Sequence, residues 1–190
     1  VLDRCAEDRA VRQDDATVVE RVERGAEELD FIDLADQMGW TRSEVQTGAT
    51  VVLRGNQDAL VDGRAIYADL RVRRALQLAI DNAVCLELGD AGRGQVAENH
   101  HVAPVHPDYA EVGHTPYDPE GAVALLEEAG MLDFEHDLVT LDDGLTMRTG
   151  DAAEALLKDA GIKVTRTALP GSRFWRARKS YPLSITAWPP

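Results

Sequence analysis

Two adjacent carboxylates, Asp142 and Asp143, are the most direct candidates for a charged binding site. They follow an apolar run, residues 138–141, that predicts a strand. Paired carboxylates at the end of a strand could hold a ligand amine or another cation through charge-assisted hydrogen bonds. Together with Gly144 they also form an ordinary turn sequence. The sequence therefore leaves two interpretations open, a cation-binding pair and a structural turn.

A second group of polar side chains lies in one segment and contains Asn99, His100, His101 and His106. Imidazole is a common metal ligand, so this group raises a metal hypothesis. The spacing argues against it, because adjacent residues of an extended chain point to opposite faces and no HExxH pattern is present. We expect no metal and no cofactor. Asn99 and His100, together with Arg93, are instead candidate ligand contacts or structural residues of a loop.

The sequence offers little for catalysis or for binding nucleic acid. An enzyme needs a nucleophile, a base and an orienting group in one place, and neither GxSxG nor a phosphate-binding loop with Lys-Ser/Thr occurs. We therefore expect no enzyme. The formal net charge of −14 makes nucleic acid and anionic membranes unfavourable partners, because binding phosphates requires a basic stripe. No apolar run reaches the ~20 residues that span a bilayer.

The elements that must position these residues follow an α/β order. Val72, Ala75, Leu76 and Ala79 share one helical face after Asp69, a natural N-cap. Residues 89–119 contain four glycines and four prolines and predict a long loop. A helix begins at Asp118-Pro119 and ends at Gly130. Then come a predicted strand at 138–141, a helix at 149–160, a strand after Gly161, a short element near 174–175, and a strand at 183–187.

The first part of the chain differs from the rest. Residues 1–48 have weak periodicity, with a short acidic helix expected near 16–28, and a composition shift at about residue 48 is the one boundary we predict. Cys5 and Cys85 lie far apart and belong to no CxxC pair. They could pair in an oxidising compartment or remain isolated thiols, with Cys85 acting as a small helical core residue.

Several of these segments resemble one known family. Residues 69–81 read DLRVRRALQLAID, which resembles the D-x-R-V-R-x-A-L-x-x-A-I-D helix of the extracellular solute-binding proteins of family 5, the dipeptide, oligopeptide and nickel group. Residues 117–130, YDPEGAVALLEEAG, look like that family's next helix, and LKDAGIKV at 157–164 resembles its L-x-x-x-G-I-x-V segment. The resemblance extends from Asp69 to Trp188 and is weaker before residue 69.

The resemblance implies a fold and a set of boundaries. It implies an α/β protein, a three-layer lobe of the periplasmic-binding-protein-like class II fold, and an incomplete one because family members are much longer. Residues 1–48 would come from the end of the first lobe or the hinge, and residues 49–190 would form part of the second, ligand-binding lobe. On this interpretation Val1 lies inside a longer chain and Pro190 ends where the wall of the cleft should continue.

The resemblance also implies ligand-contacting positions. Trp188 falls where the family has a cleft tryptophan that stacks on or flanks the ligand, and a large aromatic ring with one N–H suits such a site. Packing at a domain edge is the alternative for this residue. The family places ligand-facing residues near Asp142 and Asp143, and its long loop, here carrying Asn99, His100 and Arg93, near the cleft.

The implied function is the solute-binding component of an ABC importer, which captures a small organic solute such as a peptide in the periplasm and delivers it to a membrane permease. A protein–protein interaction or regulatory module built on the same lobe is the alternative. Such a module would not expose the apolar patch that a severed lobe should expose near its missing strands. The ligand itself stays undetermined, because residues of both lobes select it.

Overall fold

The structure is a computed structural model that describes residues 27–41, 46–100 and 102–188. The chain separates into two compact units, residues 1–46 and 47–190. In the first unit, helix α3 (Glu27–Gln37) ends before Gly39, which has a φ of 70°. The predicted helix near 16–28 lies largely outside the described residues. The origin of residues 1–48 in a first lobe or hinge stays a prediction.

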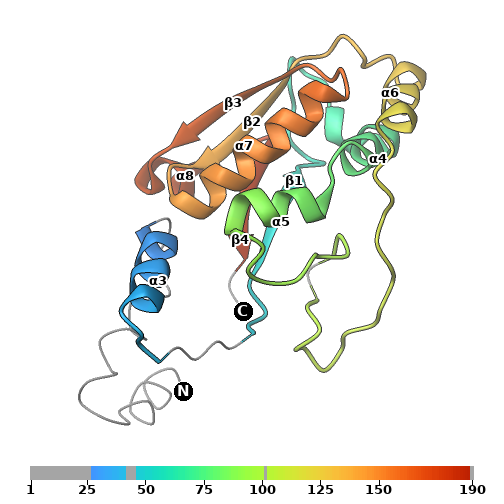
Figure 1. Cartoon of the computed structure of the whole chain (residues 1–190). Helices are drawn as coiled ribbons and strands as arrows, with labels where there is room; N and C mark the ends of the chain where they lie inside the picture. Colours follow the sequence, from blue (N-terminus) through green and yellow to red (C-terminus); the bar gives the residue numbers. More distant parts are fainter. Residues whose placement is uncertain (1–26, 42–45, 101, 189–190) are drawn as a thin grey trace. The chain divides into compact units, whose positions relative to one another are not determined.

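The second unit is built on one mixed four-stranded sheet (Figure 1). Its strands are β1 (Thr50–Gly55), β2 (His136–Leu141), β3 (Val164–Leu169) and β4 (Leu183–Trp188), in the spatial order β1-β4-β2-β3. Strand β2 is parallel to both of its neighbours, whereas β1 is antiparallel to β4. The α/β class expected from the sequence is confirmed.

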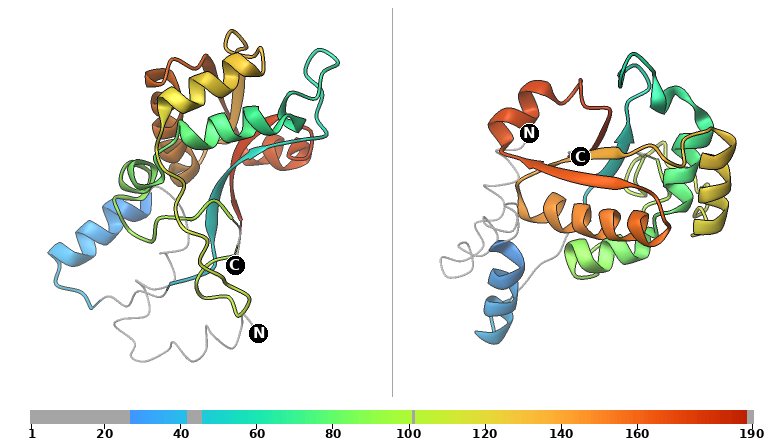
Figure 2. Two further views of the ribbon diagram at one scale, coloured as in Figure 1. Left: turned by 90° about the vertical axis from the view of Figure 1, so that its right-hand side faces the viewer. Right: turned by 90° about the horizontal axis from the view of Figure 1, so that it is seen from above.

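The two parallel connections, from β2 to β3 and from β3 to β4, run in opposite directions across the sheet and place helices on both of its faces (Figure 2). Helix α7 (Gly144–Asp159) connects β2 to β3 on one side, and α8 (Gly171–Ala177) carries the chain back past β2 to β4. Because parallel crossovers are right-handed, a reversal of direction puts the second helix on the opposite face. The result is three layers, helix on sheet on helix.

One face of the sheet carries most of the core. Helices α4 (Leu70–Leu78), α5 (Asn82–Asp90) and α6 (Pro119–Glu128) join α7 there, and α4 packs on α6 as α5 packs on α7. Leu138 and Leu183 of the sheet pack against the apolar faces of these helices in one cluster. The helices contribute, among other residues, Val72, Ala75, Leu76, Leu126 and Leu157. Burial of this cluster is the main stabilising contribution to the unit.

The opposite face has a smaller core. Val139 and Leu141 point to it, because successive residues of a strand alternate between faces, and Phe174 of α8 packs on both. Phe174 is fully buried, and its ring makes an edge contact with that of Trp175 at 5.4 Å between centroids. Helix α8 is thus fixed to the sheet by one aromatic side chain.

Helix starts follow the capping residues in the sequence. The side chains of Asp69, Asp81, Asp118 and Asp143 each accept a backbone N–H in the first turn of α4, α5, α6 and α7. The predicted start of α7 at residue 149 is wrong. Asp143 caps it, so the helix begins at Gly144, and the turn expected after residue 141 is the first turn of this helix.

The α7 helix also lies unusually close to the sheet. A Cβ atom added to Gly150 would stand 2.8 Å from Thr140 Cγ2 and 3.1 Å from Arg166 Cδ. The Arg166 guanidinium lies beside this glycine and pairs with Asp151 and Glu154 of α7, while its Nη1 donates to Thr140 Oγ1 at 3.1 Å. Glycine at position 150 therefore allows the ion pairs that join α7 to β3.

A polar pair lies inside the larger core. His136 and Tyr67 are 0% and 1% exposed, and the Tyr67 hydroxyl is 2.9 Å from His136 Nδ1. Phe134 packs edge-on against the imidazole, and Nε2 has no hydrogen-bond partner among the described residues. Burial lowers the pKa of His136 to about 4, because the interior disfavours its charged form. The same desolvation raises the pKa of Tyr67.

This buried histidine predicts a specific acid sensitivity. The unfolded chain protonates His136 near pH 6.5, whereas the folded protein resists protonation until about pH 4. The unfolded state thus binds more protons in this window, and the stability contribution present above pH 6.5 is lost as the pH falls. We expect the free energy of unfolding to fall by ~3 kcal/mol from this residue. Urea unfolding at a series of pH values measures it.

Two variants isolate the effect of His136. In His136→Leu this part of the pH dependence should disappear, even if the variant is less stable at neutral pH. The matched control is His114→Leu, since His114 is an exposed loop histidine and its replacement should leave the pH profile unchanged. Equal slopes for the wild type and His136→Leu would contradict the assignment.

Candidate functional site

The carboxyl ends of the parallel strands form the edge at which the predicted binding residues can meet. The segments that leave β2 and β3 go to opposite faces of the sheet, to α7 and to α8. In open α/β sheets, this reversal opens a crevice outside the carboxyl ends of the strands, where ligands bind. We call the ends of β2, β3 and β4, together with the start of β1, the carboxyl edge.

Asp142 and Asp143 both lie at this edge but have different surroundings. Asp143 Oδ1 accepts hydrogen bonds from Thr146 N at 2.9 Å and from Thr146 Oγ1 at 2.6 Å, so it caps α7. The Asp142 backbone N–H continues the pairing with β3 by donating to Leu169 O at 2.8 Å. The Asp142 carboxylate is exposed and makes no hydrogen bond with the described residues. Asp142 is therefore the better placed of the two for a ligand.

Trp188 is the last residue of β4 and is 44% exposed. It is paired with Thr50, the first residue of β1. In the register that joins Val139 to Ser184, Thr186 lies level with the end of β2, so Trp188 extends beyond β2 at the carboxyl edge. Asp142 and Trp188 thus come from the ends of neighbouring strands.

The long loop reaches the same edge through His106. A Cβ atom on Gly48 would stand 2.5 Å from His106 Nε2, so the imidazole lies directly on this glycine, just before β1. His106 Nδ1 accepts a hydrogen bond from Ala103 N at 2.8 Å, which fixes the ring within its own turn. In the sequence, His106 is singled out only as a candidate metal ligand, and its position at this edge is not predicted. The signal that could have identified its position is Gly48, which stands shortly before the apolar residues 51–53.

Asn99 and His100 have structural contacts in the same loop. Asn99 has a φ of 65°, and its side chain joins Asn82 of α5 at 3.2 Å and Thr115 at 3.3 Å. His100 Nε2 is 3.1 Å from Glu98 Oε2, and His100 Nδ1 accepts from Val102 N at 3.2 Å. The polar atoms of both side chains are therefore used in contacts within the loop and with α5, and their role as ligand contacts stays a prediction.

Glu98 is the centre of this local network. Its Oε2 also accepts from Val112 N at 3.2 Å, and the hydrogen bonds from Val112 and His100 hold its pKa below the usual value. Through this one carboxylate, the part of the loop around His100 is joined to the part around Val112.

Arg93 follows α5, and its backbone N–H donates to Asp90 O at 2.9 Å. Burial raises the pKa of Asp90, and the charges of Arg148 and Arg93 oppose that rise. Arg93 is thus placed beside the carboxyl end of α5. Its contact with a ligand stays a prediction.

Neither of two surface hollows in the described part of the chain is lined by the six predicted residues. One, of about 330 Å³, is lined by residues 175–180, and the other, of about 310 Å³, lies between Arg64 and Met131. Within residues 27–41, 46–100 and 102–188, no three His, Cys, Asp or Glu side chains are grouped to hold a metal ion. In the same ranges, no helix is both long and apolar enough to cross a membrane.

The Asp142–Asp143 pair gives a test that separates ligand binding from capping. Asp143→Ala removes the N-cap of α7 and should lower the free energy of unfolding by ~1 kcal/mol. Asp142→Ala removes an exposed carboxylate and should change it by less than ~0.5 kcal/mol. Denaturant unfolding of both variants measures the difference. Equal losses of stability would show that Asp142 has a structural role that its surroundings do not explain.

The contact between Gly48 and His106 predicts a coupled pair. Gly48→Ala should displace the imidazole, because the added methyl group would overlap it, and should lower stability by ~1 kcal/mol or more. In a His106→Ala background the same change should cost much less. A double-mutant cycle by thermal unfolding measures this coupling. Additive effects of the two changes would mean that His106 does not lie on Gly48.

Comparisons with known proteins agree with this architecture. The profile of the family described as bacterial extracellular solute-binding proteins, family 5 Middle, matches residues 5–190. The match covers nearly the whole sequence, so the chain belongs to this family of solute-binding proteins. A search of curated proteins gave no significant match.

Solved structures share the fold at low identity. The murein tripeptide binding protein MppA of Escherichia coli superimposes with a TM-score of 0.71 at 17% identity, over 87% of this chain and 34% of that one. NikA of Brucella suis, in complex with Fe(III)-EDTA, gives 0.66 at 22% identity, over 84% of this chain and 34% of that one. A dipeptide binding protein of Pseudoalteromonas, in complex with Met-Leu, gives 0.64 at 19% identity, over 74% and 28%.

The chain therefore spans about a third of the length of these structures. This confirms the expectation of a partial periplasmic-binding-protein-like fold.

Proposed function

We propose that this chain forms part of the solute-binding component of an ABC importer and captures a small organic solute such as a peptide. The observation that carries the proposal is the carboxyl edge, where Asp142 and Trp188 extend from the ends of neighbouring strands in a member of a solute-binding family. Two of the similar structures are named for binding a murein tripeptide and a dipeptide.

The proposed chemistry at this edge is recognition without a chemical step. The Trp188 ring would pack on an apolar part of the solute, while its N–H supplies one directional contact. Asp142 would hold a positively charged group such as a peptide amine. The loop residues Asn99, His100 and Arg93 would border the ligand, with Asp143 keeping Asp142 in place through the cap of α7.

The proposal includes a location and a partner. The protein would act outside the cytoplasm, in the periplasm where the cell has one, and would deliver its solute to the permease of the importer. Family membership supports this location. The other lobe of the protein, joined to this one by a hinge, would close over the solute and bury its other side.

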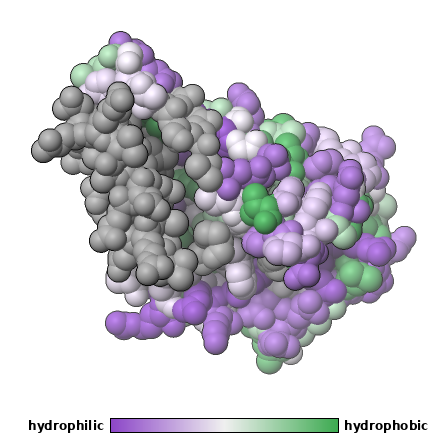
Figure 3. Space-filling view, turned by 90° about the horizontal axis from the view of Figure 1, so that it is seen from below, coloured by the Kyte–Doolittle hydropathy of each residue, from purple (hydrophilic) through white to green (hydrophobic). Residues whose placement is uncertain are grey.

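A protein–protein interaction or regulatory module is the second candidate function. Such a module needs a contiguous surface for its partner. On the face shown in Figure 3, hydrophilic residues predominate outside the grey region, and hydrophobic residues are scattered among them. On this face the described residues form no large apolar patch of the kind expected near the missing strands of a severed lobe, so a binding experiment on the full-length protein has to decide between the two functions.

Trp188 provides the decisive test, and the chain contains a matched control. Trp40 is 40% exposed, against 44% for Trp188, but lies in the first unit, after α3. In the full-length protein we expect Trp188→Ala to weaken binding of the co-purifying solute at least tenfold, a loss of ~1.4 kcal/mol. Trp40→Ala should leave the affinity unchanged. Mass spectrometry under native conditions identifies the solute, and calorimetry measures its affinity.

Two results would contradict the proposal. Equal losses in both tryptophan variants would remove the carboxyl edge as the binding site. Full-length protein that carries no solute, binds no peptide and instead retains a protein partner would favour the interaction module.

The 190-residue chain alone should bind peptides more weakly than micromolar, since one lobe buries only part of a ligand, and calorimetry with Met-Leu and a tripeptide checks this.

A further inference from the structure

The end of the chain has the opposite charge from the rest. Residues 160–190 contain six cationic side chains and no Asp or Glu, although the whole chain has a formal net charge of −14. Four of the six, Arg173, Arg176, Arg178 and Lys179, lie in and directly after α8 and are exposed. This concentration of positive charge is not explained by the proposed solute site at the carboxyl edge.

These four side chains differ from several other cations of the described chain in their surroundings. None forms an ion pair within the described residues, whereas Arg71, Lys158, Lys163 and Arg166 each do. The dipole of α8 favours a cation in its last turn and so accounts for Arg176. The helix end also accounts in part for Arg178, its C-cap, because one guanidinium nitrogen donates to Trp175 O, but it does not account for Lys179 or for the other donors of Arg178. Their charges remain available to an anion.

The backbone of this cationic segment is held in place by β1. Arg54 Nη2 donates to the Arg178 carbonyl, and Asn56 Nδ2 donates to the Lys179 carbonyl at 2.8 Å. Ser180 closes the turn, because its N–H and its hydroxyl both donate to Ala177 O at 2.8 Å. The two cationic side chains therefore project from an ordered turn, which lowers the entropic cost of binding.

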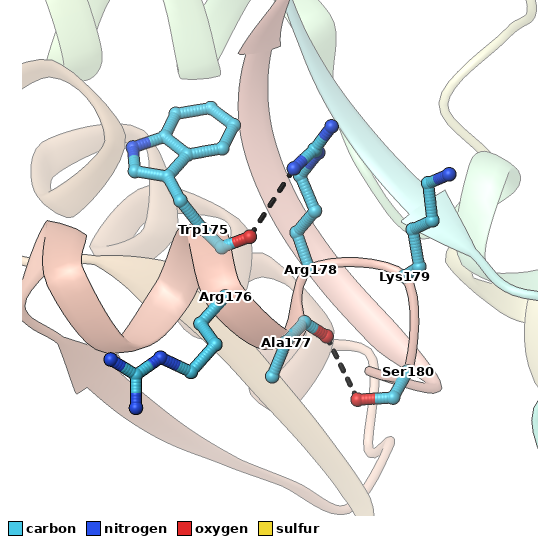
Figure 4. A pocket seen from close by; sticks show the side chains of 6 residues that line it. All are labelled: Trp175, Arg176, Ala177, Arg178, Lys179 and Ser180. Carbon is cyan, nitrogen blue, oxygen red and sulfur yellow. Dashed lines mark hydrogen bonds between the residues drawn. The ribbon is translucent and has the colours of Figure 1, made fainter.

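The side chains form one side of the 330 Å³ hollow lined by residues 175–180 (Figure 4). Trp175, Arg178 and Lys179 extend in the same direction, and Arg176 points elsewhere. Arg178 Nη1 donates to Trp175 O at 3.2 Å, and its guanidinium carbon stands 5.8 Å from the centre of the Trp175 ring. This contact orients the guanidinium while leaving donors for a ligand.

We propose that this hollow is a second ligand site, one that binds a group bearing a phosphate or a carboxylate. A guanidinium presents paired donors that match the two oxygens of such a group, and the nearby ammonium adds a point charge. The exposed indole supplies an apolar wall for the remainder of the ligand. The site uses α8 and the turn after it, so it does not depend on the proposed solute site.

The test uses inorganic phosphate and citrate as probes on the 190-residue chain, at ionic strength held constant with sodium chloride. The indole N–H signals of the three tryptophans, Trp40, Trp175 and Trp188, report the position of binding in nuclear magnetic resonance spectra. We expect a saturating shift of the Trp175 signal with at least one probe and no shift of the Trp188 signal.

Charge-matched variants make the result specific. Arg178→Gln and Lys179→Gln should each weaken binding about tenfold, which corresponds to ~1.4 kcal/mol. Arg74→Gln removes the same charge from an exposed cation of α4 that forms no ion pair with the described residues and should leave the affinity unchanged. All three positions are exposed, and unchanged backbone amide spectra verify that the variants are folded.

Vesicles containing phosphatidylglycerol distinguish the source of the phosphate group. Vesicle binding that is lost in Arg178→Gln, together with phosphate binding, assigns the site to a lipid headgroup, and phosphate binding alone assigns it to a free solute. The proposal is overturned if neither probe gives a saturating shift, or if Arg74→Gln weakens binding as much as Arg178→Gln. Either failure leaves the comparison of Trp188 with Trp40 in peptide binding untouched.

Discussion

The parallel pairing of β2 with both of its neighbours is the constraint on which the rest of the structure depends. Since a parallel connection must cross the sheet with a fixed hand, pairing β3 on one side and β4 on the other forces α7 and α8 onto opposite faces. For the same reason, the segment that leaves β2 and the segment that leaves β3 go to opposite faces of the sheet. The three layers, the cap at Asp143 and the position of Asp142 all follow from this one arrangement of strands.

Much of this arrangement could be predicted because its determinants are local. The caps at Asp69 and Asp118 and the period-two pattern of 183–187 specify their elements without reference to distant residues. The start of α7 was not predicted correctly, because Asp-Asp-Gly satisfies the rules for a turn and for a helix cap equally well. Only the neighbouring Thr146, which donates twice to Asp143, distinguishes the two.

The site was less predictable than the fold, because its residues meet through contacts between segments far apart in the sequence. Nothing local indicates that His106 lies on Gly48, or that Asn99 joins Asn82 and Thr115. Likewise, the hydrogen bonds from the Arg54 and Asn56 side chains to the carbonyls of residues 178 and 179 join the start of the described second unit to the turn after α8. Sequence patterns identify which residues are polar and exposed, but pairings of this kind need the three-dimensional structure.

The way the long loop is fastened has a consequence for how such a protein can diversify. Its attachment depends on polar side chains, with Glu98 joining its two arms and Asn99 tying it to α5, while the apolar cluster beneath belongs to other segments. Substitutions or insertions in the loop can therefore accumulate with little loss of folding stability. Mutational drift in this region could change what is recognised while the scaffold persists.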